Sequence, residues 1–217
     1  AGAGVIGEGA AYNYIGSSSW IALATKKPIY DPDYRTFTFG HIVPGMFMPT
    51  GTMQAAGASY QWARDQLCPL ERQAAETLDV SPYELMNLTA SKSPVGANGL
   101  IFLPYMMGER SPVWDPHARG VFFGLSLSTT RADMIRAILE SAAYGLRQMF
   151  DIAEQATGHS AKQVIAVGGG AQNPLWTQIK ADVWGKTILT PRLQEGACLG
   201  AAMVGGVATG VYADWQA

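Results

Sequence analysis

A long periodic segment between Thr130 and Thr157 constrains the fold most strongly. Apolar side chains recur in it every three or four residues, as on one face of an α-helix. They are Ile135, Ile138, Leu139, Ala142, Leu146, Met149, Phe150 and Ala153. Thr130 and the acidic Asp133 form an N-terminal cap, and Gly158 is a typical helix end. The sequence therefore predicts one long amphipathic helix over 130–157.

Extended apolar segments lie on both sides of this helix. Residues 12–15 and 20–24 flank the turn Gly16–Ser19, and this arrangement predicts a β-hairpin. Further strands are expected at 36–43, 46–49, 99–103, 163–167 and 187–190. Further helices are expected at 52–67, from Ser81 onward, at 174–184 and at 196–209, whereas 106–127 is expected to be irregular. Strands followed by alternating helices and strands predict an α/β fold, a mixed sheet with helices packed on it.

The balance of charges excludes several classes of function. The 217 residues carry 15 Lys and Arg against 17 Asp and Glu, a net charge of -2. A near-neutral chain has no electrostatic footprint for nucleic acid or for an acidic membrane surface. There is no run of eighteen apolar residues, so a membrane-spanning helix is not expected. Charged residues make up 15%, against about 25% in a typical soluble domain, which predicts an unusually uncharged surface.

Cysteine and histidine residues give no sign of a disulfide scaffold or of a metal site. Cys68 and Cys198 lie far apart and suit a reducing compartment, so a cytoplasmic location is expected. His41, His117 and His159 do not have the spacing of metal ligands. The chain is therefore expected to bind no metal ion through residues of its own.

Two glycine loops are candidate phosphate sites. Residues 168–171 follow a strand and open a helix, where free backbone N–H groups and the helix N-terminus favour a phosphate, ribose or base. This segment is not a G-x-G-x-x-G pattern and lacks the lysine of a P-loop, so a tight strand-to-helix turn is the alternative. The hairpin tip 16–18 is either a hydrogen-bond donor to phosphates or an ordinary turn. The small residues of 196–209 predict a tightly packed helix.

Three segments together are more specific than any one of them. They are 108–120 with Phe123–Leu125 behind it, 167–173 with Gln178, Asp182 and Gly185 behind it, and 195–202. In this order and spacing they resemble the C-terminal domain of the FGGY carbohydrate kinases, a family that includes xylulokinase, gluconokinase and glycerol kinase. The resemblance runs from Ala3 to Val211. The Glu-Arg-Ser-Pro sequence at 109–112 is more similar to the xylulokinase and gluconokinase branch.

The resemblance implies an actin-like, ribonuclease-H-like ATPase fold, in which two domains enclose a cleft. Residues 1–217 would form the C-terminal, nucleotide-binding domain, whereas the sugar would lie mostly on an N-terminal domain that this chain lacks. The implied cofactors are ATP and the Mg²⁺ bound with it in the complete enzyme. The implied partners are the N-terminal FGGY domain, a sugar substrate, ATP or ADP, and a second copy in a homodimer.

The resemblance also implies nine nucleotide-binding residues. They are Gly16, Ser17 and Ser18 in the phosphate loop, Gly57 and Gln61 in a following stretch, and Gly169, Gly170, Ala171 and Asn173 in the adenosine motif. Ser17 would donate its hydroxyl to the phosphates. The adenosine loop is about a residue shorter than in glycerol kinases, so Gly170 matches the family's adenine position more closely than Asn173 does.

Several other residues match family positions without a settled role. Asp115, Arg119 and Asp182 fit either catalysis or a structural ion pair or cap. Glu109 and Arg110 lie on a loop that either faces the cleft, toward sugar or phosphate, or is structural.

The general base of the family is missing from this chain. It is an Asp in a Gly-x-Gly-Asp stretch ahead of the phosphate loop, whereas residues 2–16 contain no Asp and Glu8 is their only acid. The chain is therefore expected to hold no catalytic residue and to be inactive alone. It would be the C-terminal half of a kinase that phosphorylates a xylulose-type ketose or gluconate. The alternatives are a non-catalytic nucleotide-binding or regulatory module of the same fold, and a structural domain whose glycine loops only pack.

Overall fold

The computed structural model describes residues 2–192 and 195–215. Its centre is a six-stranded sheet formed by β1 (Ala11–Ile15), β2 (Ser19–Leu23), β3 (Phe37–Gly40), β4 (Phe47–Met53), β7 (Gln163–Val167) and β8 (Thr187–Leu189). The strand order is β3-β4-β2-β1-β7-β8. The strands β1, β7 and β8 run parallel to one another, and the other neighbours pair antiparallel. The predicted hairpin and mixed sheet are confirmed.

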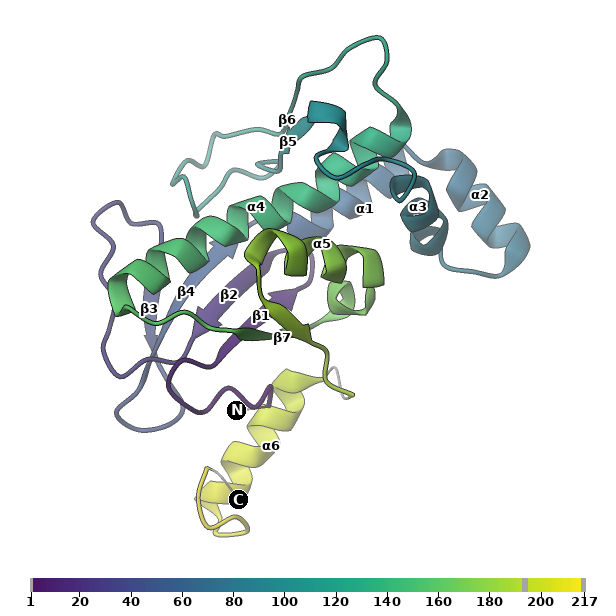
Figure 1. Cartoon of the computed structure of the whole chain (residues 1–217). Coiled ribbons are helices and arrows are strands. Elements are labelled where there is room, and N and C mark those ends of the chain that lie inside the picture. Colours follow the sequence, from purple (N-terminus) through teal and green to yellow (C-terminus); the bar gives the residue numbers. More distant parts are fainter. Residues whose placement is uncertain (1, 193–194, 216–217) are drawn as a thin grey trace.

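Helices pack against this sheet or against one another. They are α1 (Ala56–Gln66), α2 (Pro69–Leu78), α3 (Pro82–Ala90), α4 (Arg131–Thr157) and α5 (Pro174–Trp184). The long helix α4 crosses the sheet and lies between α5 on one side and α1 and α3 on the other (Figure 1). Its buried residues contribute to two apolar clusters, one against α1, α3 and α5 and one against the strands.

The helix α4 forms as the sequence predicts. Thr130 accepts a hydrogen bond from the backbone N–H of Asp133, and the Asp133 carboxylate accepts one from the backbone N–H of Thr130. This reciprocal capping box satisfies two N–H groups that would otherwise lack partners. Gly158 ends the helix with a φ of 69°, a left-handed conformation that glycine adopts without strain.

Three predictions of local structure are wrong or incomplete. Residues 52 and 53 continue β4 instead of starting a helix, because Thr52 and Met53 pair with Trp20 and Ser19 of β2. The helix α2 was not predicted. The segment 106–127, expected to be irregular, contains β6 (Val121–Phe123), which pairs with β5 (Ile101–Leu103) in a two-stranded ribbon. In the two strand segments, pairing with another strand decides the local structure.

The last helix, α6 (Gly196–Ala208), corrects the prediction of tight packing. It extends away from the sheet in Figure 1, and the structure records no buried residue in it. Its close neighbours are Gly2, which lies against Gly196 and Gly200, and Tyr212, which lies against Gly206. The small residues therefore permit a close approach at two places, while the remaining residues of this apolar helix are half-buried or exposed. No described helix is both long and apolar enough to cross a membrane.

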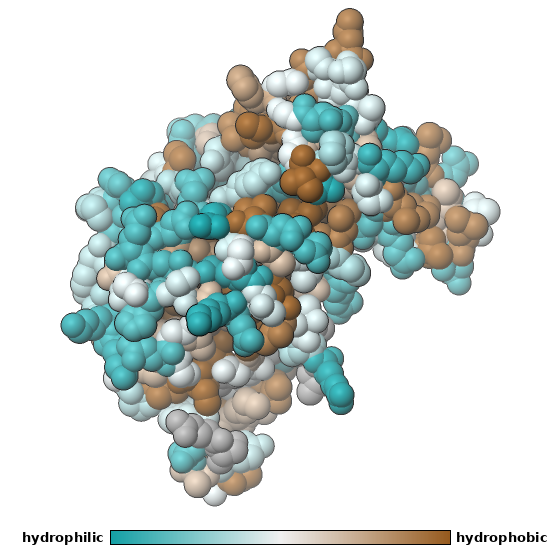
Figure 2. Space-filling view, in the orientation of Figure 1, coloured by the Kyte–Doolittle hydropathy of each residue, from teal (hydrophilic) through white to brown (hydrophobic). Residues whose placement is uncertain are grey.

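Exposed apolar side chains gather on the β5–β6 ribbon. Phe102 is buried against the core, whereas Ile101, Leu103, Val121 and Phe123 are exposed. Figure 2 shows polar side chains over much of the viewed face and apolar ones toward its upper end, where Figure 1 places β5 and β6. The β5–β6 ribbon is thus one of the places where apolar side chains are exposed.

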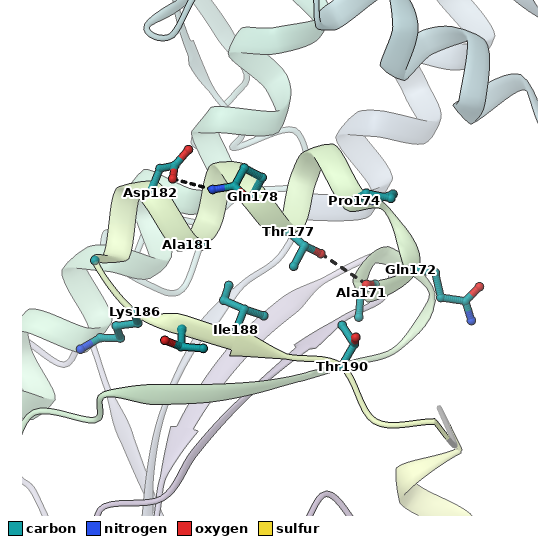
Figure 3. Close-up of a pocket in the computed structure, with 12 residues that line it drawn as sticks. Ala171, Gln172, Pro174, Thr177, Gln178, Ala181, Asp182, Lys186, Ile188 and Thr190 are labelled. Atoms are coloured by element: carbon teal, nitrogen blue, oxygen red, sulfur yellow. Dashed lines mark hydrogen bonds between the residues drawn. The ribbon is translucent and has the colours of Figure 1, made fainter.

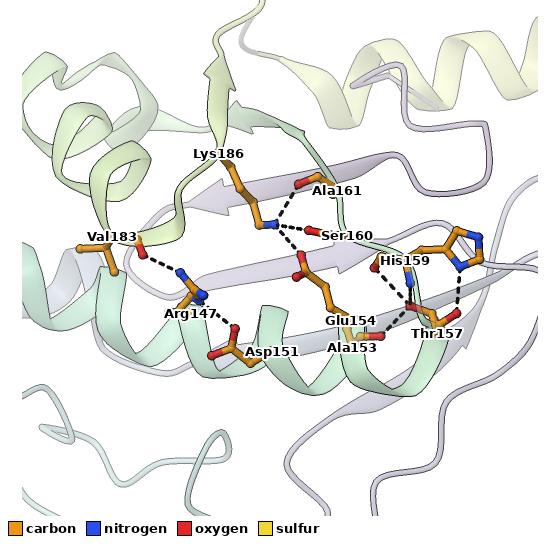
Figure 4. A network of polar contacts seen from close by, with 10 residues as sticks. All are labelled: Arg147, Asp151, Ala153, Glu154, Thr157, His159, Ser160, Ala161, Val183 and Lys186. Carbon is orange, nitrogen blue, oxygen red and sulfur yellow. Dashed lines mark hydrogen bonds and ion pairs between the residues drawn. The ribbon is translucent and has the colours of Figure 1, made fainter.

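A buried lysine joins the end of α4 to the start of β8. The Lys186 ammonium donates hydrogen bonds to the Glu154 carboxylate, to the Ser160 hydroxyl at 3.2 Å and to the Ala161 carbonyl at 2.8 Å (Figure 4). The Lys186 side chain is 6% exposed. The same picture contains the ion pair between Arg147 and Asp151, whose side chains are 44% and 42% exposed.

These two ion pairs predict different costs of removal. Lys186→Met leaves a largely buried carboxylate and a carbonyl without their donor, so we expect a loss of about 3 kcal/mol in the free energy of unfolding. Arg147→Met removes an exposed pair, and we expect a loss below about 1 kcal/mol. Urea unfolding at neutral pH measures both. Equal losses in the two variants would contradict the structural role of Lys186.

Candidate nucleotide site

A cavity of about 490 Å³ opens where four segments meet. They are the β1–β2 turn, the first turns of α1, the helix α3, and a short 3-10 helix η2 (Gly169–Gln172) ahead of α5. Ligand pockets for small molecules typically enclose about 300–1,000 Å³, so the cavity is large enough for a mononucleotide.

Seven of the nine nucleotide-binding residues expected from the sequence line this cavity. They are Gly16, Ser17, Gly57, Gln61, Gly169, Gly170 and Asn173. Ser18 is not in its lining, and its carbonyl accepts a hydrogen bond from the backbone N–H of Gly16. Ala171 is buried and lies in a neighbouring groove between η2, α5 and β8, where its carbonyl accepts a hydrogen bond from Thr177 (Figure 3).

The hairpin turn and the start of α1 are in direct contact. A Cβ atom at Gly57 would overlap the carbonyl oxygen of Gly16, so only glycine fits there. The backbone N–H of Ala58 donates to the carbonyl of Ser17 at 2.8 Å. Ala55, at the N-cap of α1, offers no side-chain cap. The N-terminus of α1, with its partial positive charge, therefore lies beside the turn.

The triglycine segment docks on the end of β1. Gly168 has a φ of 90°, and a Cβ there would lie 2.6 Å from the carbonyl oxygen of Ile15. A Cβ at Gly170 would overlap the Ile15 side chain. Gly169 differs, because a Cβ built on it meets nothing within 4 Å. Gly168 and Gly170 thus permit the close approach, and Gly169 borders open space in the cavity.

The sequence did not reveal the part of the cavity wall that Tyr60 and α3 contribute. Asn87 accepts hydrogen bonds from the Tyr60 hydroxyl and from the Asn173 amide, both at 2.9 Å. The amide oxygen of Asn173 in turn accepts from the backbone N–H of Trp176 at 3.0 Å and caps α5. Both the NH₂ group and the oxygen of the Asn173 amide are therefore engaged in hydrogen bonds within the fold. For α3 itself, the sequence offered the serine-proline signal of a helix start.

Aromatic rings form the floor of the same region. The Tyr60 ring lies 5.1 Å from that of Tyr83 and 5.8 Å from that of Trp176, measured between centroids. Burial raises the pKa of the Tyr60 hydroxyl, so it remains a hydrogen-bond donor at physiological pH. This surface can take a flat, apolar ring system.

The charges around the cavity are few. Among its described lining residues there is no Lys or Arg, and Glu84 is the one acid. An anion would therefore be held by backbone N–H groups and hydroxyls. No group of three or more His, Cys, Asp or Glu that could hold a metal ion occurs in residues 2–192 and 195–215.

The remaining family positions make local contacts. Asp115 accepts a hydrogen bond from the backbone N–H of His117, and Arg119 donates to backbone carbonyls of its own loop. Asp182 accepts from Gln178 at 2.7 Å (Figure 3). Glu109 is buried and bonded to backbone N–H groups. These contacts correspond to the structural alternatives for Asp115, Arg119 and Asp182, and they keep Glu109 out of the cavity lining.

The mixed sheet, with its helices and its glycine-bordered cavity, defines an α/β domain of the actin-like ATPase class. Residues 11–209 match the C-terminal domain of the FGGY family of carbohydrate kinases. The chain belongs to this family, as the three sequence segments indicated.

Relatives cover nearly all of this chain. A gluconokinase of Bacillus subtilis is 32% identical over 203 residues, which are 94% of this chain and 39% of that protein. A xylulose kinase of Staphylococcus epidermidis is 35% identical over 97% of this chain and 40% of its own length. The crystal structure of a ligand-bound xylulose kinase from Lactobacillus acidophilus superposes with a TM-score of 0.85 at 27% identity, over 98% of this chain and 41% of the other. The chain thus spans about two fifths of the length of these relatives.

Proposed function

We propose that this domain is the nucleotide-binding part of an ATP-dependent sugar kinase. The reaction transfers the γ-phosphate of ATP to a hydroxyl of a carbohydrate, a xylulose-type ketose or gluconate. The observation that carries the proposal is the cavity in which the β1–β2 turn, the N-terminus of α1 and the triglycine segment converge. Names of the relatives, gluconokinase and xylulose kinase, support the two substrate classes.

Each wall of the cavity has a role in the proposal. The phosphate chain lies along the turn of Gly16 and Ser17, where the hydroxyl of Ser17 and the N-terminus of α1 offer hydrogen bonds and positive potential. The adenine base of the nucleotide lies against Tyr60 and beside Gly169, where the cavity is open. Phosphoryl transfer depends mostly on positioning and on neutralising charge. This domain supplies the positioning.

The rest of the machinery is assigned to an N-terminal FGGY domain. Because the described lining has no Lys or Arg, neutralisation of the phosphates requires Mg²⁺ brought with ATP and groups from that domain. The same domain would supply the base for the sugar hydroxyl and most of the sugar pocket. The apolar helix α6, in which no residue is buried, and the 40% coverage of the relatives support a domain partner.

We further propose a cytoplasmic location and a homodimer. The low cysteine count and the kinase relatives support a cytoplasmic location. The exposed apolar face of the β5–β6 ribbon supports a homodimer.

We expect the chain alone to show no sugar kinase activity. A coupled ADP-release assay with Mg-ATP and xylulose or gluconate measures it, with calorimetric titration of ADP beside it. Co-expression with the N-terminal domain of a relative should restore turnover. ADP binding without turnover in both preparations would favour the regulatory-module alternative, and turnover by the chain alone would contradict the proposal.

A further inference from the structure

Glu109 is a buried acid whose carboxylate, within the described part of the chain, accepts hydrogen bonds from backbone N–H groups. One carboxylate oxygen accepts hydrogen bonds from the N–H of Gln54 at 3.0 Å and from the N–H of Arg110 at 2.8 Å. The other oxygen is buried and has no partner among the described residues. The residue is 4% exposed. Glu109 therefore joins the loop after β5 to the segment between β4 and α1, which is 55 residues earlier in the chain.

The N–H group that Glu109 holds belongs to Gln54, directly ahead of α1, the helix that contacts the β1–β2 turn. Gln54 precedes Ala55, the N-cap residue of α1, which provides no side-chain cap. Four residues after Gln54, the N–H of Ala58 donates to the carbonyl of Ser17. Gly57 lies between them and packs closely on the turn, because a Cβ atom built on it would overlap the carbonyl oxygen of Gly16. A small shift of Gln54 would therefore be passed to the contact between α1 and the turn.

The Glu109 carboxylate is not a strong source of global stability. Burial raises its pKa, which means that the surroundings disfavour its charged form. A buried carboxylate with one unpartnered oxygen carries a desolvation cost that two backbone hydrogen bonds offset only in part. The consequence of its contacts is thus local, at the start of α1.

We propose that Glu109 is a positioning residue that fixes the N-terminal end of α1 against the phosphate turn. The carboxylate holds the backbone one residue ahead of Ala55, the N-cap residue, which has no side-chain cap of its own. The link to nucleotide affinity rests on the proposed function, whereas the effect on α1 does not.

Amide hydrogen exchange measured by NMR tests the proposal on the whole chain. Three variants separate the effect of side-chain length from the effect of the negative charge. Glu109→Leu removes the acceptor, Glu109→Asp keeps the charge but withdraws it from Gln54, and Glu109→Gln keeps an acceptor oxygen at the same reach. We expect exchange at Gln54 and Ala58 to become at least tenfold faster in the Leu and Asp variants and to stay within about threefold of the wild type in the Gln variant.

A second buried carboxylate serves as the control. Asp133 accepts hydrogen bonds from Ser93, Asn98 and Thr130 at the start of α4. Asp133→Asn should lower the global stability without a selective change at Gln54 and Ala58. Unchanged local exchange in both Glu109→Leu and Glu109→Asp would overturn the proposal. If Glu109→Leu does not fold, the comparison of the Asp and Gln variants decides.

ADP titration adds a readout that separates the two proposals. We expect the dissociation constant of ADP to rise about tenfold in Glu109→Asp and to be restored in Glu109→Gln. A wild-type chain that binds no ADP would contradict the proposed function, while the exchange rates would still decide the role of Glu109.

Discussion

Gly169→Leu should abolish most of the nucleotide affinity of this domain without lowering its stability. Gly169 lines the cavity, its φ is not in the left-handed range, and a Cβ there meets nothing within 4 Å. A leucine side chain therefore fits the fold, but it occupies the space in which the adenine base of the nucleotide is proposed to lie. We expect the dissociation constant of ADP to rise at least about thirtyfold, which corresponds to about 2 kcal/mol.

The matched control is another glycine with open surroundings. Gly40, at the end of β3, also has nothing within 4 Å of a built Cβ, and it does not line the cavity. Gly40→Leu should leave ADP affinity unchanged. Calorimetric titration gives the affinities, and thermal melting shows whether both variants stay folded. Normal ADP binding by Gly169→Leu would contradict the proposed position of the nucleotide.

The elements that local sequence could predict are those whose signals lie within a few residues. The capping box at Thr130 and Asp133 and the glycine at 158 mark both ends of α4 correctly. The hairpin was predicted because a Gly-Ser turn separates two apolar runs. The start of α1 was wrong because Thr52 is held in β4 by pairing with Trp20, a contact across 32 positions that no local pattern contains.

The same distinction applies to the candidate site. Its glycines could be found because they stand in short motifs. Asn87 could not, because it becomes part of the site through Asn173, 86 residues later. The role of Glu109 likewise depends on Gln54, and the segment around it predicted only a family loop. Site residues that come from helices distant in sequence can be identified only once the fold is known.

Lys180→Met should stabilise the domain at neutral pH. Lys180 is 1% exposed in α5. Its ammonium lies 3.5 Å from the Asn13 amide oxygen, and 5.5 and 5.9 Å from the ring centroids of Trp176 and Trp184. Burial lowers its pKa to about 7 from 10.5, so the charged form is strongly disfavoured in the fold.

The sign of the pH dependence follows from this shift. Between pH 7 and about 10.5 the unfolded chain holds the lysine proton and the folded chain has released it. The contribution of Lys180 to stability therefore rises with pH across this window, by up to about 1.4 kcal/mol per pH unit. Below pH 7 both states are protonated, and the cost of the buried charge is constant.

Methionine has a similar length and carries no charge, so it removes this cost at pH 7. Loss of the two cation–π contacts and of the Asn13 partner offsets part of the gain. We therefore expect Lys180→Met to be about 2 kcal/mol more stable than the wild type in urea unfolding at pH 7, with the difference closing toward pH 10. Lys92→Met, at an exposed lysine, should show no such difference. A Lys180→Met variant that is less stable than the wild type at pH 6 and 7 would show that the ammonium is stabilised in the core, and that the buried charge is not a cost to this fold.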